Sequence, residues 1–466
     1  MSRTIRVGDL SAAAAAFICA QPDLPAATLD RVKLVIADTF SANIAGATSD
    51  VLPVLQRYIA ASGGQGDKVL LGTTLRTAPE LAALANGTMS AALEFDDVLS
   101  MMPGHPSAVV MGALQADDAA LAATGADVAA SYAVGVQAGA RIAQAMTLDH
   151  YKRGFHVTGT VALFSAVGAL AHIRSLDEAT TRRALGIAAS MASGIHGNFG
   201  TMAKPLHSGL AARNAVAAVQ LATAGLTASE RVFETEGGFF DAYGSENSSA
   251  RHVEGLFAGP WIFDEPGVTL KLFPCCYASH RGMDAVQTLM ARMGIGAADV
   301  ESVVGLAPPG GLIPLKFPKP KTHFESLFSL PYALAVTLLD GHPGLRSFSQ
   351  QRVTSADVAA MLDRITVTES DDCVADHPGY EQKSYGSRGE VRVRITTRDG
   401  RSDAEHVHLA PGHPARPMTW QQAQAKFLGC AAVAGFDAAT SEILFERIAA
   451  IEQQPRFGDL VNSLAF

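Results

Sequence analysis

The stretch AALANGTMSAALEFDDVLSMMPGHPS, residues 82–107, contains both a candidate core helix and a candidate reactive turn. Ala82 to Leu93 is rich in alanine and other small residues, which let neighbouring helix backbones approach closely. We therefore expect a helix that is buried on several faces. The following residues place three carboxylates just before a Pro-Gly-His-Pro turn. Carboxylates and a histidine at the end of a helix are suited to general acid–base chemistry. A solvated acidic helix end followed by a surface turn is the alternative interpretation.

The composition describes a compact globular protein that is long enough for more than one domain. Of the 466 residues, 48% are hydrophobic and only 17% are charged. The formal net charge of −9 argues against a nucleic-acid partner, whose binding surface would be basic. The sequence contains no apolar run of the roughly 18 residues that a membrane span needs. Five scattered cysteines form no CxxC pair and fit a reducing cytoplasm.

Helical patterns dominate the first half of the chain and return at its end. Many of these segments carry small residues on several faces, which indicates a large all-α core. We expect helices over Leu29–Ala45, Pro79–Leu93, Ala108–Thr124, Asp127–Thr147, Gly159–Ile173, Glu178–Gly194, Leu206–Thr223, Ser229–Thr235, Trp420–Val433 and Ala438–Gln453.

A different pattern begins near Val268. Val300 to Ala307 alternates between apolar and polar residues like a strand, as does Arg364 to Thr368. Glu390 to Thr397 and Ala404 to Leu409 read as a hairpin around an Arg-Asp-Gly turn. These strands alternate with helical segments, which is typical of an α+β unit.

The two patterns together predict the domain organisation. We expect a mostly α fold, in which residues 1–268 and residues 411–466 build one large helical domain from both chain ends. Residues 269–410 would form a smaller α+β lid domain inserted between these two parts.

The candidate catalytic residues of the opening stretch are Glu94, Asp97 and His105. Prolines and a glycine flank His105, and they restrict the backbone so that the ring can be held in one place. Asp96, together with Asp97 and His105, could alternatively bind a metal ion, as in a metal hydrolase.

A second motif, YKRGFHVTGT, occupies residues 151–160 and carries His156 and Thr158. Both lie at the predicted start of a helix, where free N–H groups favour an anion. His156 could therefore face a carboxylate-bearing ligand. A capped helix with a partly buried histidine is the alternative.

A third motif, GIHGNFGTMAKPLHSGLAARN, occupies residues 194–214. Gly200 and its neighbouring glycines let the backbone approach a ligand, while Lys204 and His207 lie at a helix entrance marked by a proline. The glycine spacing fits neither a dinucleotide fingerprint nor a P-loop. We interpret the motif as an anion site, and a loop with a solvated lysine is the alternative.

Two later motifs complete the set. LKLFPCCYASHRGMD, residues 270–284, carries Lys271 where the α+β unit begins, so this lysine could face the helical domain across a cleft. ESLFSLPY, residues 325–332, places Tyr332 at a helix start. A tyrosine in such a place more often serves packing.

Five stretches in this order resemble motifs of the MmgE/PrpD family: LEFDDVLSMMPGHPS, RGFHVTGT, FGTMAKPLHSGLAARN, KLFPCCYASH and FSLPYALAVTLLDG. That family includes 2-methylcitrate dehydratase, cis-aconitate decarboxylase and iminodisuccinate epimerase. The resemblance runs from about Ala12 to Phe457 and implies a helical domain, an α+β lid and a cytoplasmic homodimer. It also implies chemistry without a metal or an organic cofactor.

The resemblance places the active-site positions of the family on Glu94, Asp97, His105, His156, Lys204, Lys271 and Tyr332. Two positions depart from the common pattern. The position of Glu94 is often aspartate, and Val98 stands where threonine is common, which removes a hydroxyl group. Both departures count against a decarboxylase.

Members of this family handle a proton on a carbon next to a carboxylate, so the site must supply positive charge where a carbanion develops. We assign that charge to Lys204 and Lys271, helped by N–H groups near Gly200. His105 is our first choice for acid–base work and His156 our second. Glu94 and Asp97 would orient and polarise the histidines, and Tyr332 would contribute a hydrogen bond from the lid. His207 and Thr158 complete the set as substrate-binding residues.

We therefore expect a cofactor-independent lyase, and specifically a dehydratase, that acts on a small hydroxylated di- or tricarboxylate. An epimerase or racemase of an iminodisuccinate-like dicarboxylate and a cis-aconitate decarboxylase are the alternatives within the family. A carboxylate-binding protein without catalysis is the alternative from another class. We expect no nucleic-acid or membrane partner.

Overall fold

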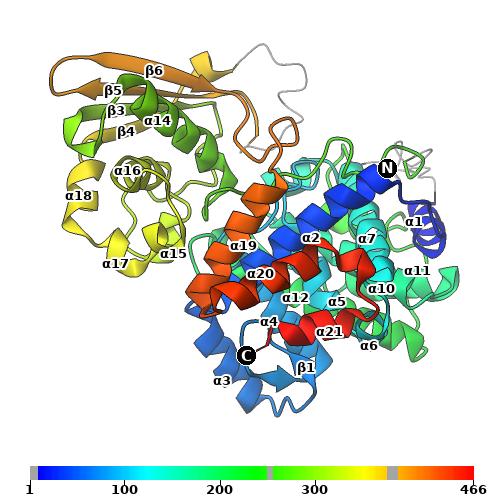
Figure 1. Ribbon diagram of the computed structural model, residues 1–466. Coiled ribbons are helices and arrows are strands. Elements are labelled where there is room, and N and C mark those ends of the chain that lie inside the picture. The colour runs from blue at the N-terminus through cyan, green and yellow to red at the C-terminus, as the bar shows by residue number, and fades with distance from the viewer. Residues whose placement is uncertain (1–8, 249–255, 375–386, 466) are drawn as a thin grey trace.

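A computed structural model describes residues 9–248, 256–374 and 387–465, which form two bodies of unequal size (Figure 1). The larger body is built mainly from helices, and the smaller body contains a four-stranded sheet. The mostly α class predicted from the sequence is thereby confirmed. The exact domain boundaries and the action of the smaller body as a lid stay predictions.

The larger body contains helices from both ends of the chain, and the red C-terminal helices lie beside the blue helix α2 in Figure 1. A short strand pair, β1 and β2, extends it near α3. Its elements are α1 (Leu10–Cys19), α2 (Ala26–Gly46), α3 (Val51–Ala61), β1 (Lys68–Val69), β2 (Arg76–Thr77), α4 (Pro79–Ala91), α5 (Pro106–Leu114), α6 (Asp118–Ala122), α7 (Gly125–Met146), α8 (Asp149–Lys152), α9 (Val157–Thr160), α10 (Ala162–Ile173), α11 (Glu178–Ala189), α12 (Ala203–Thr223), α13 (Phe239–Tyr243), α19 (Trp420–Ala434), α20 (Ala438–Ala449) and α21 (Phe457–Ser463).

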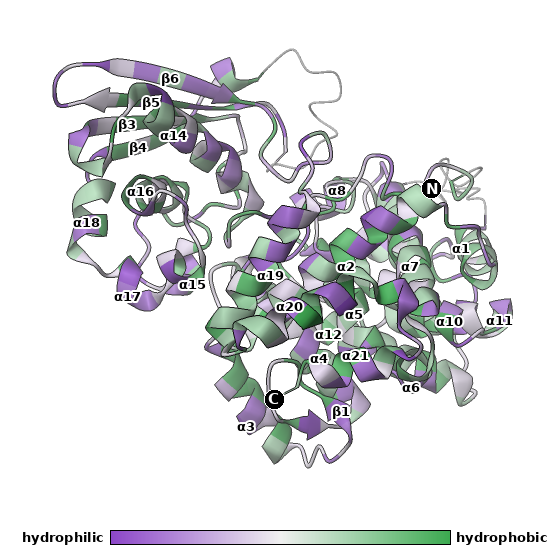
Figure 2. Ribbon diagram, viewed as in Figure 1, coloured by the Kyte–Doolittle hydropathy of each residue, from purple (hydrophilic) through white to green (hydrophobic). Residues whose placement is uncertain are grey.

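The smaller body pairs its strands in the order β4-β3-β5-β6. β3 and β4 run parallel, whereas the β3–β5 and β5–β6 pairs are antiparallel. The outermost strand, β6, is mostly hydrophilic (Figure 2), as expected for a strand at a solvent-exposed edge. The elements are α14 (His280–Met293), β3 (Val300–Ala307), α15 (His323–Ser326), α16 (Leu330–Asp340), α17 (Gln350–Val353), α18 (Ala356–Leu362), β4 (Ile365–Glu369), β5 (Val391–Thr397) and β6 (Ser402–Val407). The predicted hairpin is confirmed.

Glycines let three helices of the larger body cross in direct backbone contact. A β-carbon added at Gly209 of α12 would lie 2.1 Å from the carbonyl oxygen of Leu84 in α4. One added at Gly112 of α5 would lie 2.8 Å from the backbone nitrogen of Gly87 in α4. Because both distances are far below a normal carbon contact, a larger side chain would push these helices apart. The predicted close helix packing is confirmed, and it fixes how the ends of α4, α5 and α12 lie relative to one another.

Several predicted helices differ from the structure. The helix expected over residues 159–173 is divided into α9 and α10, and the helix expected over residues 178–194 ends at Ala189. The helix expected over residues 108–124 is two helices, because the Asp117 side chain accepts hydrogen bonds at 3.0 and 3.2 Å from two N–H groups of α6 and starts a new helix. The helix expected over residues 229–235 is a series of turns. There Gly237, with φ +69°, helps the chain to reverse, so that Phe239 N donates to Val232 O at 2.7 Å.

Within the described ranges, we find no helix with the length and hydrophobicity that crossing a bilayer would require.

Candidate active site

Three helix ends of the larger body meet at one cavity. Glu94 follows α4, His105 directly precedes α5, and Lys204 lies in the first turn of α12. All three side chains line the cavity, and Pro314 and Phe328 from the smaller body line it as well. The cavity therefore lies between the two bodies, in a place where ligand sites often occur.

A buried network of charges forms one wall of this cavity. The ammonium group of Lys204 pairs with Glu94 Oε1. Lys271 Nζ lies 3.2 Å from the other oxygen, Glu94 Oε2, and 3.4 Å from Asp96 Oδ1. Lys204 is 2% exposed and Lys271 is fully buried. Two carboxylates thus balance two ammonium groups in a region from which water is largely excluded.

The network keeps Glu94 ionised. Burial raises the pKa of its carboxyl group, but the charges of Lys204 and Lys271 outweigh that effect and hold the pKa below its usual range. For Lys271, burial lowers the pKa, yet the charges of Glu94 and Asp96 leave it above the usual value. Glu94 also adopts φ +51°, a left-handed backbone conformation that costs a non-glycine residue of the order of 1–3 kcal/mol. Such local strain is typical of functional sites.

Hydrogen bonding fixes the tautomer of His105. Its Nδ1 lies 2.6 Å from the backbone oxygen of Asp97, and a carbonyl oxygen can only accept, so Nδ1 carries the hydrogen. In the neutral ring, Nε2 is then free to accept a proton, and it lies 3.5 Å from Lys204 Nζ. The backbone N–H of His105 donates to Thr158 Oγ1 at 3.0 Å, which fixes the loop itself.

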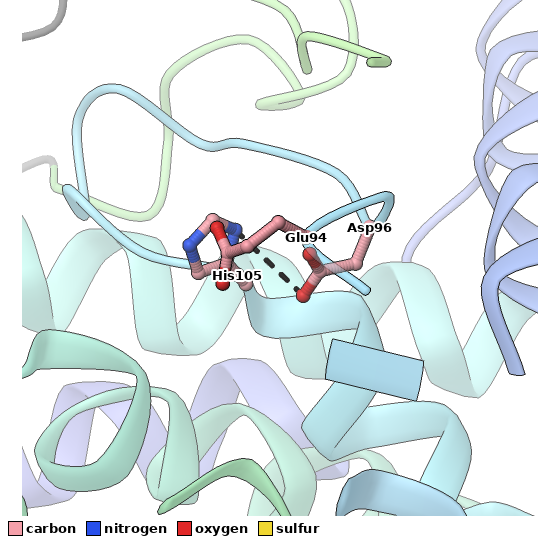
Figure 3. A group of neighbouring side chains, drawn as sticks. All are labelled: Glu94, Asp96 and His105. Atoms are coloured by element: carbon pink, nitrogen blue, oxygen red, sulfur yellow. Dashed lines mark ion pairs between the residues drawn. The ribbon is translucent and has the colours of Figure 1, made fainter. Parts of the chain in front are cut away.

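Asp96 is the carboxylate that faces His105 (Figure 3). Its Oδ2 lies 3.7 Å from His105 Nδ1, and the dashed line in the figure marks this contact. Burial lowers the pKa of His105, Asp96 opposes this effect, and Lys204 adds to it, with a net shift to about 4. His105 is therefore neutral at neutral pH in the absence of a bound anion.

His156 lines the same cavity and is held by a second histidine. Its Nδ1 lies 2.9 Å from Nδ1 of His207, and its ring centroid is 6.3 Å from that of His105. Burial, followed by the charge of Lys204, holds the pKa of His156 well below its usual value. Because two ring nitrogens face each other, one must donate and the other accept. His207 thus orients His156 and is not among the residues that line the cavity.

The Asp97 side chain does not face the cavity. Its Oδ1 accepts a hydrogen bond from Ser107 N at 3.3 Å in the first turn of α5. Burial, with a further contribution from the charge of Asp96, raises the pKa of Asp97 to about 8. The carboxyl group is therefore mostly protonated at neutral pH. The expected orienting role belongs to the backbone carbonyl of Asp97, whereas the side-chain role stays a prediction that the geometry does not favour.

Four other predicted residues lie away from the cavity wall formed by the described residues. Tyr332 is fully buried, and its hydroxyl donates to Ser347 O at 2.6 Å, so its expected hydrogen bond in the site stays a prediction. A β-carbon added at Gly200 would lie 2.3 Å from the ring of Phe317, so the glycine leaves room for that ring, and its expected contact with a ligand stays a prediction. Lys271 acts from behind Glu94. Thr158 holds the His105 backbone.

The sequence pattern did not single out several residues of the wall. The rings of Phe199 and Phe328 lie next to each other, with centroids 5.6 Å apart, and Lys204 Nζ is 5.8 and 5.6 Å from these centroids. Cys276 lines the cavity as well, and burial raises its pKa to about 11, so that it stays a thiol. These residues lie within or next to the quoted motifs, but apolar residues there could not be told from ordinary core residues.

The carboxylates and the histidine could also be considered as metal ligands. Donor atoms of Glu94, Asp96 and His105 all lie within 4.8 Å of one another (Figure 3). However, Lys204 and Lys271 place their ammonium groups against oxygens of the same carboxylates. A divalent cation would have to compete with these two positive charges, so the donor set fits an ion-pair network better than a metal centre.

Comparison with known protein families agrees with the motifs. The family model described as the MmgE/PrpD N-terminal domain matches residues 12–251, and the model of the MmgE/PrpD C-terminal domain matches residues 273–449. The chain belongs to the MmgE/PrpD family. The two models together cover all of the cavity-lining residues named above.

Curated relatives of this MmgE/PrpD protein carry one activity in their names. The chain is 25% identical to the human cis-aconitate decarboxylase over 409 residues, which is 86% of this chain and 82% of the human protein. It is 28% identical to the cis-aconitate decarboxylase of Aspergillus terreus over 419 residues, 84% of this chain and 83% of that protein. A cis-aconitate decarboxylase-like protein of Aspergillus oryzae is 25% identical over 383 residues, 77% of this chain and 78% of that protein.

Proposed function

We propose that this protein is a carboxy-lyase that removes carbon dioxide from cis-aconitate or a closely similar unsaturated tricarboxylate. The proposal rests on one observation above all: in a chain similar to cis-aconitate decarboxylases, His105 and Lys204 meet at a buried cavity wall. The decarboxylase was an alternative in the sequence analysis, and the similarity to these relatives favours it over the dehydratase.

The reaction needs a stabilised negative charge and one proton. When the carboxylate on the saturated CH2 carbon leaves as CO2, its bonding electrons form a new CH2=C double bond. The former double-bond electrons move to the neighbouring CH carbon, which bears another carboxylate. A proton must then be added at that carbon, which gives 2-methylenesuccinate. The positive charge of Lys204 is placed to stabilise the developing carbanion.

His105 is the group that we assign to deliver the proton. Its Nε2 is unprotonated in the free protein, but a bound tricarboxylate adds negative charge next to the ring and raises the pKa of His105. The ring can then hold a proton at Nε2 while Nδ1–H stays bonded to Asp97 O at 2.6 Å. His156, oriented by His207, is the second proton carrier at the same cavity.

A dehydratase is the second candidate, because one observation favours it. The neutral His105 presents an unprotonated Nε2, which is the form that a general base requires. Dehydration begins with removal of a proton from carbon, so this resting state suits a hydroxy acid as substrate. The same groups would serve both reactions in different protonation states.

Proton NMR in D₂O on chelator-treated protein tests these functions directly. Separate samples receive cis-aconitate, citrate, 2-methylcitrate and iminodisuccinate. We expect cis-aconitate to give two new vinyl signals and a methylene group that carries one deuterium. A new alkene signal from either hydroxy acid, with cis-aconitate unchanged, would instead establish the dehydratase, and hydrogen–deuterium exchange without an alkene would indicate an epimerase.

The pH dependence of kcat/KM separates the acid role of His105 from the base role. If His105 must be protonated, kcat/KM falls by about tenfold per pH unit as pH rises above the pKa of about 4, because the protonated fraction of the free enzyme falls. If His105 acts as a base, kcat/KM rises through that pKa and then stays level. We expect the fall with cis-aconitate, measured between pH 5 and 8 by initial rates that are corrected for ionisation of the substrate.

A further inference from the structure

Lys426 is a buried lysine on helix α19, and it does not line the cavity described above. Its ammonium group donates three hydrogen bonds: to Asp38 Oδ1 at 2.6 Å, to Phe95 O at 2.6 Å and to Lys271 O at 3.0 Å. These bonds use all three of its N–H donors. The nitrogen also lies 3.8 Å from the centroid of the Phe95 ring.

Each acceptor belongs to a different part of the site. The Phe95 carbonyl lies between Glu94 and Asp96, the two carboxylates of the charge network. The Lys271 carbonyl belongs to the residue whose side chain pairs with both of them. Asp38 is in the middle of α2 and anchors the ammonium group to the helical core. One nitrogen therefore fixes the acidic loop and the Lys271 segment relative to the core.

A buried ion pair such as Asp38–Lys426 is not needed for folding stability, because removing two charges from water costs free energy. Well-packed apolar side chains in place of a buried lysine–carboxylate pair often leave a protein equally stable or more stable. Lys426 donates to the backbone carbonyls of Phe95 and Lys271, on both sides of the charge network, and so orders those segments in a way that an apolar residue cannot. Misplacement of a reacting group by about 1 Å can cost about 10²-fold in rate.

We propose that Lys426 is a positioning residue for the reaction: it holds the Glu94–Asp97 loop and Lys271 in the arrangement that orients His105. The link to His105 is the carbonyl of Asp97 in the same loop, which accepts the Nδ1–H hydrogen bond. This inference rests on the proposed function, because its kinetic readout is the turnover of cis-aconitate.

The main test replaces both members of the pair by apolar groups, so that no unpaired charge is buried, whereas the single Lys426 variant leaves Asp38 without its ammonium partner. In Asp38→Leu/Lys426→Met, and in Lys426→Met alone, we expect kcat to fall by about 10–100-fold. KM should stay within about threefold of wild type, because Lys426 does not line the cavity. The matched control is Lys33→Met, which breaks a pair with Glu452, 2.9 Å long, between α2 and the C-terminal segment. Its kcat should equal that of wild type.

A second readout does not depend on activity. Nitrogen-15 NMR of the histidine rings, with the His105 signals assigned by their loss in His105→Gln, reports which ring nitrogen carries the hydrogen. We expect a single Nδ1–H form in wild type and in Lys33→Met, and a mixture of forms in the folded Lys426 variants. A kcat within about threefold of wild type in the folded double variant would overturn the proposal. If wild type turns over none of the acids, the proposed function fails, and an unchanged His105 spectrum would then overturn this inference separately.

Discussion

Replacement of His105 by alanine is expected to lower kcat for cis-aconitate by roughly 10²–10⁴-fold, which is the usual effect of a positioned acid–base group. The ring is the cavity-wall group that combines a fixed Nδ1–H, an open Nε2 and contact with Lys204. Its removal also deletes the group whose protonation sets the expected pH profile. Steady-state kinetics on the purified variant, with cis-aconitate saturating, measures the change.

The control for this variant is His172→Ala. His172 lies on α10, with Nδ1 2.9 Å from Ser131 Oγ, and it lines a different cavity. Its variant should keep kcat within about threefold of wild type. If kcat of His105→Ala also stayed within about threefold of wild type, His105 would not be the proton carrier. His156 would then be the next residue to replace.

Replacement of Lys204 by methionine is expected to have the largest combined effect on activity and stability. It removes the ammonium group at the cavity wall, and loss of one such charge-stabilising donor costs about 10²–10³-fold in kcat. It also leaves Glu94 buried with one ammonium partner fewer, and breaking a buried ion pair costs about 3–5 kcal/mol of unfolding free energy. Initial rates and urea unfolding measure the two effects separately.

A double variant separates the two roles of Lys204. In Glu94→Gln/Lys204→Met the unpaired charge is gone, so we expect much of the unfolding free energy to return while activity stays low. Lys319→Met serves as the control, because Lys319 and its partner Asp363 are both exposed and the pair contributes little. Recovery of turnover in the double variant would contradict the assigned role of Lys204 at the reacting carbon.

The sequence allowed a good prediction of the elements and of the motifs, because both depend on local patterns. Alternation over Val300–Ala307 indicated β3, and the Arg-Asp-Gly turn indicated the β5–β6 hairpin. Helix ends were less certain: the Asp117 cap that divides residues 108–124 was not recognised. A homodimer and a cytoplasmic location stay predictions from the family resemblance.

The sequence predicted which residues belong to the site better than it predicted the role of each residue. Glu94, His105, His156 and Lys204 were expected at one site, and the structure brings them to one cavity. Asp97 was expected to act through its carboxylate, yet its carbonyl oxygen makes the contact with His105. A backbone group leaves no signal in the sequence, so this role could not be predicted.

The sequence by itself determined the mostly α class, the order of helices and strands, and which titratable residues stand at helix ends. Only the tertiary structure decided which of these side chains face the cavity and which support them from behind. Lys426 and Asp38 are 388 residues apart in the chain, and Lys204 and Glu94 are 110 apart. Periodicity and capping act over a few residues, whereas ion pairs and tautomers depend on groups that only the folded core brings together.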